Sequence, residues 1–327
     1  MGKRTVLSCI SLIIGSAFHL SAGAAEVVLY SSNDVQTVST LVDRFEQQNP
    51  DIQVSVVRAG TGALMQRIKA EASNPLGDVF WSGGLSTIGA YLEQLQPYQS
   101  PEREAVPSEY RSPEDLFLGT NLHVTVLMAN ERQTPDGALP SGWADLADEK
   151  WKGKIVIPDP KFSSASYVAL FGLRSILGDD VFARIVGNAV IVGTTSAAYQ
   201  GVANGEFAVA VTMEYAAYQY VAGGQSEVRL IYPEEGTFLS PEGMALIKGG
   251  KHPDEARKLY DFLASATVQT EIFKSAFRRP VRTDIDVSTL SKLPALADIK
   301  LLPLHHKQME AGRADFLAYW SELSAAR

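Results

Sequence analysis

The chain has 327 residues, of which 46% are apolar and 20% charged, so it can bury an extensive core. Its 29 basic and 37 acidic residues give a net charge of -8, and no basic run of the kind that binds nucleic acid interrupts this acidic composition. One cysteine and five scattered histidines exclude a disulfide framework, a CxxC pair and an HExxH zinc site. At roughly 150 residues per domain, the length predicts two domains.

The N-terminus has the order of segments that is typical of an export signal. Lys3 and Arg4 precede an apolar stretch over residues 6–20, and small residues follow as far as Ala25. A membrane anchor is the alternative, but the apolar stretch is shorter than the ~20 residues that span a bilayer. We therefore predict a signal peptide over residues 1–25, cleaved near Ala24 or Ala25, and a periplasmic location for the mature protein.

After this leader, short apolar runs alternate with segments of helical spacing. This alternation predicts βαβ units and an α/β fold, with two lobes that each contain a mostly parallel sheet flanked by helices. The predicted strands lie at 26–31, 52–57, 78–81, 121–129, 190–193, 207–213 and 244–248, and one more lies within the segment 151–158. The predicted helices lie at 35–48, 63–72, 163–177, 197–204 and 254–265. The expected boundaries are 26–119 for lobe 1, 120–236 for lobe 2, and 237–327 for a return to lobe 1 and the C-terminal helices.

Small hydroxyl, amide and glycine residues gather where the predicted strands end. Ligands of α/β sheets lie beyond the carboxyl ends of strands, and helix N-termini offer unpaired N–H groups and a partial positive charge. The loops therefore predict an anion site, although helix capping uses the same residue types in any single loop. The predicted ligand-binding residues in these loops are Ser31, Ser32, Asn33, Thr61, Gly62, Ser82, Gly83, Gly84, Ser163, Ser164, Ser166, Thr194, Thr195 and Ser196.

Two further groups could complete such a site. Glu214 and Tyr215 directly follow a predicted strand, so a carboxylate and a ring could contact the organic part of a ligand. Arg278, Arg279 and Arg282 form a basic cluster from which one arginine could bind an oxyanion, whereas we expect at least two of the three to be solvated. Nucleotide fingerprints, a GxSxG elbow and a Ser–His pair are missing from the sequence, which predicts neither an enzyme nor a bound cofactor or metal.

Several segments resemble the periplasmic solute-binding components of ABC importers. These segments, in chain order, are Val27–Ser32, Asp78–Gly84, Asn204–Val211, Tyr232–Thr237 and Pro241–Lys248. The chain is similar to the branch that contains ferric-ion-binding proteins and their relatives for sugar phosphates, phosphoglycerate or 2-aminoethylphosphonate. The resemblance implies a type II periplasmic-binding-protein fold with its ligand in the interlobe cleft, hinge closure about crossings near 119–124 and 236–243, and docking on an inner-membrane permease. We expect a monomer.

The residues that hold iron in the ferric branch are largely replaced here. Those relatives use a His in the first loop, a Glu after the third strand and two adjacent tyrosines. Residues 31–34 contain no His, residues 82–84 contain no Glu, and the tyrosine pair reads Tyr215-Ala216. These departures resemble the organophosphate and phosphonate binders, in which donor loops hold the phosphoryl group, and Glu214 would contact the organic part.

We therefore predict a small anionic ligand: 2-aminoethylphosphonate, a phosphoglycerate or a sugar phosphate. The acidic composition opposes long-range capture of an anion, so binding would depend on local donors. Three alternatives stay open. The protein could bind ferric iron through Tyr215 and an exogenous anion, or a polyamine or thiamine-type cation through Glu214, Asp34 and the aromatic residues. It could also be an exported enzyme or report a ligand to a membrane sensor.

Overall fold

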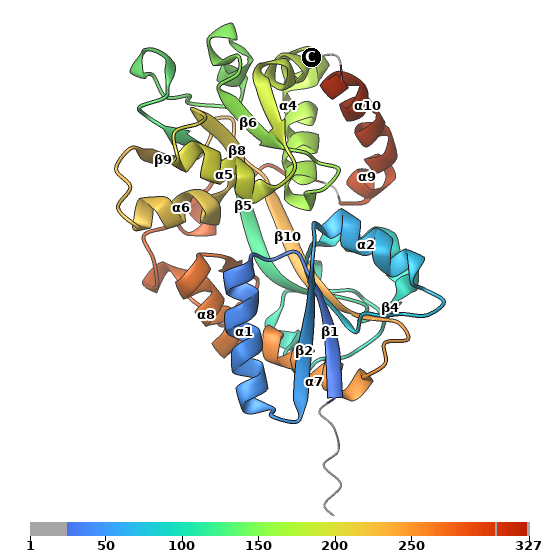
Figure 1. The fold of residues 1–327 in the computed structure, drawn as a ribbon. Coiled ribbons are helices and arrows are strands. Elements are labelled where there is room, and N and C mark those ends of the chain that lie inside the picture. Colours follow the sequence, from blue (N-terminus) through green and yellow to red (C-terminus); the bar gives the residue numbers. More distant parts are fainter. Residues whose placement is uncertain (1–24, 305, 326–327) are drawn as a thin grey trace, which may run out of the picture.

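The structure is a computed structural model that describes residues 25–304 and 306–325. The predicted signal peptide therefore lies outside the described residues, apart from Ala25. Across the described part of the chain, no helix combines the length and the apolar character needed to cross a membrane. Figure 1 shows two lobes, with the long strands β5 (Leu118–Asn130) and β10 (Leu239–Ile247) running from one to the other.

The lobe that contains the first strands has three parallel strands beside β10. These are β1 (Ala25–Ser31), β2 (Ile52–Arg58) and β3 (Val79–Gly84), in the order β2-β1-β3-β10. Short strands β4 (Leu95–Gln96) and β11 (Arg279–Pro280) pair with β10 and β5. The helices of this lobe are α1 (Val35–Gln48), α2 (Thr61–Ala70), α3 (Leu85–Ile88), α7 (Pro253–Ala264) and α8 (Ala266–Ala276).

The other lobe continues the same strand order beyond β5. Its strands are β8 (Val209–Met213), β6 (Ile155–Pro158) and β7 (Ala189–Val192), and β9 (Val228–Ile231) pairs with β5. Its helices are α4 (Ser164–Asn188), α5 (Thr195–Ala203) and α6 (Glu214–Ala222). The last helices, α9 (His306–Ala311) and α10 (Arg313–Ala325), lie beside α4, and Met309, Phe316 and Trp320 share its core with Phe182.

The predicted α/β class is confirmed, but the strands are more mixed in direction than predicted. Pairing is parallel between β1, β2 and β3 and between β6, β7 and β8, whereas β5 and β10 run antiparallel to their neighbours. Two antiparallel strands therefore occupy the centre of a sheet whose outer parts are parallel. Each lobe gains its connection to the other through these central strands.

Helical spacing located most of the helices, and a glycine explains one incorrect end. In α1, Val38, Leu41, Val42 and Phe45 form the buried face that the sequence pattern predicts. The helix predicted over 163–177 instead continues to residue 188. Gly178, with φ 77°, interrupts its backbone, and this is where the predicted pattern stopped. Helix α6 directly follows β8 and was not predicted.

Candidate functional site

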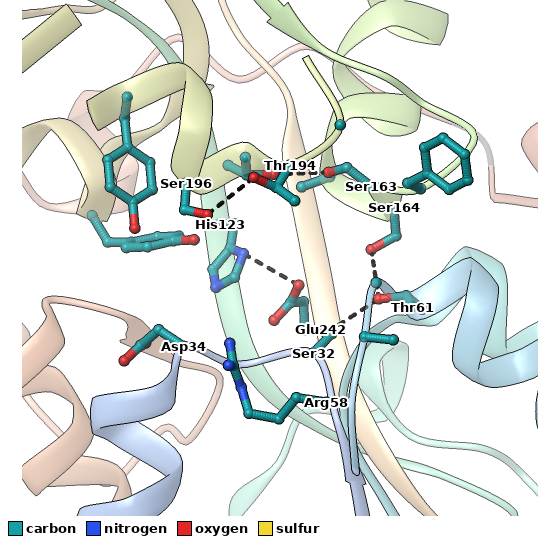
Figure 2. A pocket seen from close by; sticks show the side chains of 18 of the residues that line it. Ser32, Asp34, Arg58, Thr61, His123, Ser163, Ser164, Thr194, Ser196 and Glu242 are labelled. Atoms are coloured by element: carbon teal, nitrogen blue, oxygen red, sulfur yellow. Dashed lines mark hydrogen bonds and ion pairs between the residues drawn. The ribbon is translucent and has the colours of Figure 1, made fainter. Parts of the chain in front are cut away.

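A cavity of about 270 Å³ lies between the lobes, where the loops after several strands meet. Figure 2 shows its polar side chains converging from both lobes and from the crossing strands. From the first lobe and the segment after α8 its lining residues are Ser32, Asp34, Arg58, Ala59, Gly60, Thr61 and Arg278. From the second lobe they are Phe162, Ser163, Ser164, Ala165, Gly193, Thr194, Thr195, Ser196, Tyr199 and Tyr215, and the crossing strands add His123 and Glu242.

Three helices begin at this pocket. Gly60, Ser163 and Thr194 are the N-caps of α2, α4 and α5, and all three line the cavity. The Ser163 and Thr194 hydroxyls accept the backbone N–H of Ser166 at 3.2 Å and of Ala197 at 3.1 Å. Each helix start presents further unpaired N–H groups and a partial positive charge. The pocket therefore receives three positive helix ends, one from the first lobe and two from the second.

A chain of hydroxyl groups joins the two lobes beside these helix starts. Ser164 Oγ donates to Thr61 Oγ1 at 3.3 Å, and Thr61 Oγ1 donates to Ser32 Oγ at 3.2 Å. Ser32 Oγ in turn donates to the carbonyl of Ser82. Figure 2 shows the first two links crossing from α4 to the loop after β1. These rotatable hydroxyls can donate to an anion without adding charge or bulk.

Arg278 is buried at the pocket, and its contacts with the surrounding carboxylates and with His123 are long. Its guanidinium stacks on Tyr215, with Cζ 4.3 Å from the ring centre. Its Nη atoms lie 3.4 Å from His123 Nε2, 3.4 Å from Asp34 Oδ2 and 3.8 Å from Glu242 Oε2. Nε has no hydrogen-bond partner among the described residues. Because hydrogen bonds to charged groups are usually about 2.7–2.9 Å long, this guanidinium has capacity left for a ligand.

Acidic and imidazole groups around Arg278 have shifted pKa values. Burial raises the pKa of Glu242, which accepts a 2.6 Å hydrogen bond from Ser82 Oγ. Burial, and secondly the charge of Arg278, lowers the pKa of His123 well below 6.5, so the ring is neutral at pH 7. Burial acts against ionisation of Asp34, but hydrogen bonds from Thr37 and the charge of Arg278 outweigh it and lower its pKa. The pocket thus contains an ionised Asp34 beside a cationic Arg278.

The structure brings about half of the predicted residues to the pocket and gives the others different surroundings. Predicted residues in the lining are Ser32, Thr61, Ser163, Ser164, Thr194, Thr195, Ser196 and Tyr215. Predicted residues outside it are Ser31, Asn33, Gly62, Ser82, Gly83, Gly84, Ser166 and Glu214. Ser31 accepts from the Asn33 backbone, and Ser166 donates to the Pro158 carbonyl.

The predicted glycines serve close packing in this structure. A Cβ on Gly83 would lie 2.3 Å from the Phe80 ring, and one on Gly84 would lie 2.9 Å from Ser164 Cβ. A Cβ on Gly62 would lie 3.0 Å from the Lys161 carbonyl. Gly84, at the end of β3, therefore allows close approach to the start of α4, and Gly62, in the first turn of α2, allows close approach to the segment before α4.

Two expectations about charged residues need correction. Glu214 does not face the pocket, because its oxygens bind Arg279 Nε at 2.6 Å and Nη2 at 2.9 Å and accept from the Tyr232 hydroxyl. The expectation that at least two of the clustered arginines are solvated is wrong. Arg278, Arg279 and Arg282 are 5%, 1% and 8% exposed. Arg279 and Arg282 pair with carboxylates and Arg278 lies near two of them, which a basic cluster in a sequence does not reveal.

Among the lining residues with polar side chains, Arg58, His123, Tyr199 and Glu242 were not predicted as ligand contacts. His123 and Glu242 lie in β5 and β10, whose residues are buried almost throughout. Polar side chains in a buried strand need partners, so their presence in these apolar runs was a usable signal. Across residues 25–304 and 306–325, no group of three or more His, Cys, Asp or Glu side chains is arranged to hold a metal ion.

Two α/β lobes, joined by crossing strands around a polar pocket, define a periplasmic-binding-protein fold. The chain belongs to the family of bacterial extracellular solute-binding proteins, whose family model matches residues 90–304. Members of this family bind solutes and are not enzymes, and this chain is accordingly the substrate-binding component of an ABC importer. The predicted family, fold and class of function are confirmed.

Relatives of this chain differ in the ligands that their names give. Iron uptake protein A1 of Synechocystis is 25% identical, over 83% of this chain and 84% of that protein. A putative 2-aminoethylphosphonate-binding periplasmic protein of Salmonella typhimurium is 23% identical, over 72% of each chain. The structure of the periplasmic binding protein AfuA from Actinobacillus pleuropneumoniae, with exogenous fructose-6-phosphate bound, has a TM-score of 0.81 and 24% identity, covering 93% of this chain and 99% of AfuA.

Proposed function

We propose that this importer component captures a small organophosphate or phosphonate. The observation that carries the proposal is the meeting of three helix N-termini with two arginines, Arg58 and Arg278, in one pocket. Helix N-termini stabilise anions through their N–H groups and their partial charge. A guanidinium binds phosphoryl oxygens with charge-assisted hydrogen bonds. A doubly charged phosphoryl group matches this donor set better than a neutral solute does.

The remaining lining supports the same ligand class. Seven Ser and Thr hydroxyls line the cavity and supply donors from both lobes: Ser32, Thr61, Ser163, Ser164, Thr194, Thr195 and Ser196. When the lobes close over these donors, an anion that accepts their hydrogen bonds offsets the cost of burying them, and this adds affinity and specificity. Phosphonate and sugar phosphate are also among the ligands named for the relatives and the similar structure.

In the proposed mechanism the ligand bridges the two lobes. Loops after β1 and β2 contact it from the first lobe, and the starts of α4 and α5 contact it from the second. Hinge closure would occur about β5 and β10, within the crossings predicted near 119–124 and 236–243. The closed protein would then dock on the permease of the importer and release the ligand there.

Ferric iron is the second candidate, and one observation favours it. Tyr199 and Tyr215 both line the pocket, so two phenols are present although the adjacent tyrosine pair is lost. Iron would need phenolate oxygens. Burial raises the pKa of both tyrosines, and Arg278 occupies the face of the Tyr215 ring. These features favour the phosphoryl ligand over iron.

A ligand panel tests the proposal. Residues 26–327, refolded to remove bound ligand, are assayed by thermal shift and calorimetry with 2-aminoethylphosphonate, 3-phosphoglycerate, glucose 6-phosphate, inorganic phosphate and ferric citrate. A ligand at 100 times its Kd stabilises the protein by about 2.7 kcal/mol. Stabilisation by a phosphoryl compound supports the proposal. Stabilisation by ferric citrate alone overturns it.

The variant Ser196→Asp locates the binding. Ser196 is the second residue of α5, where an added carboxylate suits the helix dipole but repels a phosphoryl group in the pocket. We expect affinity to fall at least about 100-fold, while the unliganded protein keeps its stability. The matched control is Thr267→Asp, which adds the same charge at the second residue of α8, outside the pocket. Equal affinity in both variants would place the anion elsewhere.

A further inference from the structure

Two buried side chains on the crossing strands face the pocket with unused hydrogen-bonding capacity. His123 of β5 and Glu242 of β10 both line the cavity and are 2% and 5% exposed. His123 Nδ1 lies 3.5 Å from Glu242 Oε1, and within the described part of the chain it has no hydrogen-bond partner. Figure 2 shows the two groups facing each other between the lobes. A buried polar atom in this state favours a ligand group that pairs with it.

The surroundings determine which nitrogen of His123 carries the proton. Arg278 Nη1 lies 3.4 Å from Nε2, and a guanidinium can only donate. Nε2 is therefore the acceptor, and the neutral ring carries its proton on Nδ1. The pocket wall thus presents one donor, Nδ1–H, next to one acceptor, Glu242 Oε1.

Ser82 holds the acceptor in place. Its hydroxyl donates to Glu242 Oε2 at 2.6 Å, while its carbonyl accepts from Ser32. Ser82 has φ 69°, a left-handed conformation that is unfavourable for a residue with a side chain. In this backbone conformation the Ser82 side chain contacts Glu242 and the Ser82 carbonyl contacts Ser32, and both partners line the pocket. Glu242 therefore has one oxygen fixed by Ser82 and the other directed toward His123 and the pocket.

Only some chemical groups satisfy such a pair. A hydroxyl oxygen placed about 2.8 Å from both atoms can donate to Oε1 and accept from Nδ1–H at the same time. A primary ammonium could donate to Oε1 but would face the Nδ1–H donor with nothing to accept it. A methyl group would leave both atoms unpaired, which is costly in a buried site.

We propose that His123 and Glu242 form a hydroxyl-recognition subsite, so that the ligand is a hydroxylated organophosphate and not an aminoalkyl phosphonate. This inference rests on the proposed function, since it assumes that the donor loops hold a phosphoryl group. It assigns the specificity for the organic part of the ligand to the crossing strands. Glu214, the residue that the sequence suggested for this role, lies outside the pocket.

Three ligands of matched length test the subsite by calorimetry on the wild-type protein. They are 3-hydroxypropyl phosphate, 3-aminopropyl phosphate and propyl phosphate, which differ in one terminal group. We expect the hydroxyl compound to bind at least about 10-fold more tightly than either of the others. Equal binding of the three, or tighter binding of the amine, overturns the subsite and leaves the phosphoryl proposal standing. If none of the three binds, both proposals fail.

Two conservative variants connect this preference to the residues. Glu242→Gln and His123→Asn should reduce the ratio of the Kd values for propyl and 3-hydroxypropyl phosphate to about 3 or less. A structural defect alone would weaken both ligands and leave this ratio unchanged. The matched control is Glu214→Gln, at a buried carboxylate outside the pocket, and Tyr232→Phe is a milder control at the same place. An unchanged ratio in both pocket variants overturns the assignment.

Discussion

Two adjacent arginines lie near carboxylates in this protein, and they differ in how closely they approach them. Arg279 meets Glu214 with two bonds of 2.6 and 2.9 Å, and its Nη2 also donates to the Pro294 carbonyl at 2.7 Å. Arg278 approaches Glu242 and Asp34 no closer than 3.8 and 3.4 Å. The first pair faces the interior, and the second faces the cavity.

This difference separates a structural ion pair from a binding one. Glu214 already accepts two short hydrogen bonds from Arg279, whereas the loosely held guanidinium of Arg278 can gain short hydrogen bonds when an anion arrives. Neither burial nor sequence position distinguishes the two arginines, because both are buried and they are neighbours in the chain. The two arginines are distinguished by the distances from their guanidinium groups to the nearest carboxylates.

Breaking the closed pair should have the largest effect. Glu214→Gln leaves the charge of Arg279 buried without its counterion, which should lower the free energy of unfolding by about 3–5 kcal/mol. The folded fraction should bind ligand with unchanged affinity. Urea unfolding and calorimetry measure the two quantities separately. A loss of affinity at unchanged stability would restore Glu214 to the binding site and contradict the comparison.

Replacing the loosely held arginine should have the opposite profile. Arg278→Gln removes one charged donor from the pocket, and we expect the affinity for a phosphoryl ligand to fall roughly 10- to 100-fold. The free energy of unfolding should change by no more than about 1 kcal/mol, because the long contacts of Arg278 contribute little. Titration calorimetry with urea unfolding checks this. A large destabilisation without loss of affinity would show that Arg278 is structural.

The pH dependence of stability gives the smallest and most specific effect. Because the pKa of Glu242 is raised above 4.5, the folded state keeps this proton to higher pH than the unfolded state does. The contribution of Glu242 to the free energy of unfolding therefore falls as the pH rises from about 4.5 through the folded pKa. Glu242→Gln removes this fall, so the free energy of unfolding of the variant, relative to that of the wild type, should increase as the pH rises. If the free energies of unfolding of the wild type and the variant change in parallel between pH 4.5 and 7, this prediction is wrong.

Much of the fold and part of the site could be predicted from the sequence, for one physical reason. Apolar spacing specifies strands and helices locally, and the carboxyl ends of parallel strands meet at one edge. The sequence therefore predicted that Ser32, Thr61, Ser164 and Thr195, which follow successive strands, lie at the same site, and all four line the pocket. Their direct contact with ligand stays a prediction.

The charged part of the site could not be predicted because its pairings are distant in the chain. Glu214 accepts hydrogen bonds from Arg279, 65 positions away in the sequence, and Glu242 accepts one from Ser82, 160 positions away. A carboxylate after a strand looks the same in the sequence whether a guanidinium or a ligand will face it. Helix α6 was missed for a local reason. Its buried face contains the small residues Ala216 and Ala217, which do not form the pattern of large apolar residues that predicts an amphipathic helix.

The crossing strands also determine how this protein could be recombined with its relatives. Strand β3 pairs with β10, which follows it by more than 150 residues, so the first lobe is not one continuous segment. A chimaera with a single junction near residue 120 would join β3 from one parent to β10 from another. Exchange of a complete lobe needs at least two junctions, one in β5 and one in β10. Because His123 and Glu242 lie in these strands, the choice of junctions decides which parent supplies the back wall of the pocket.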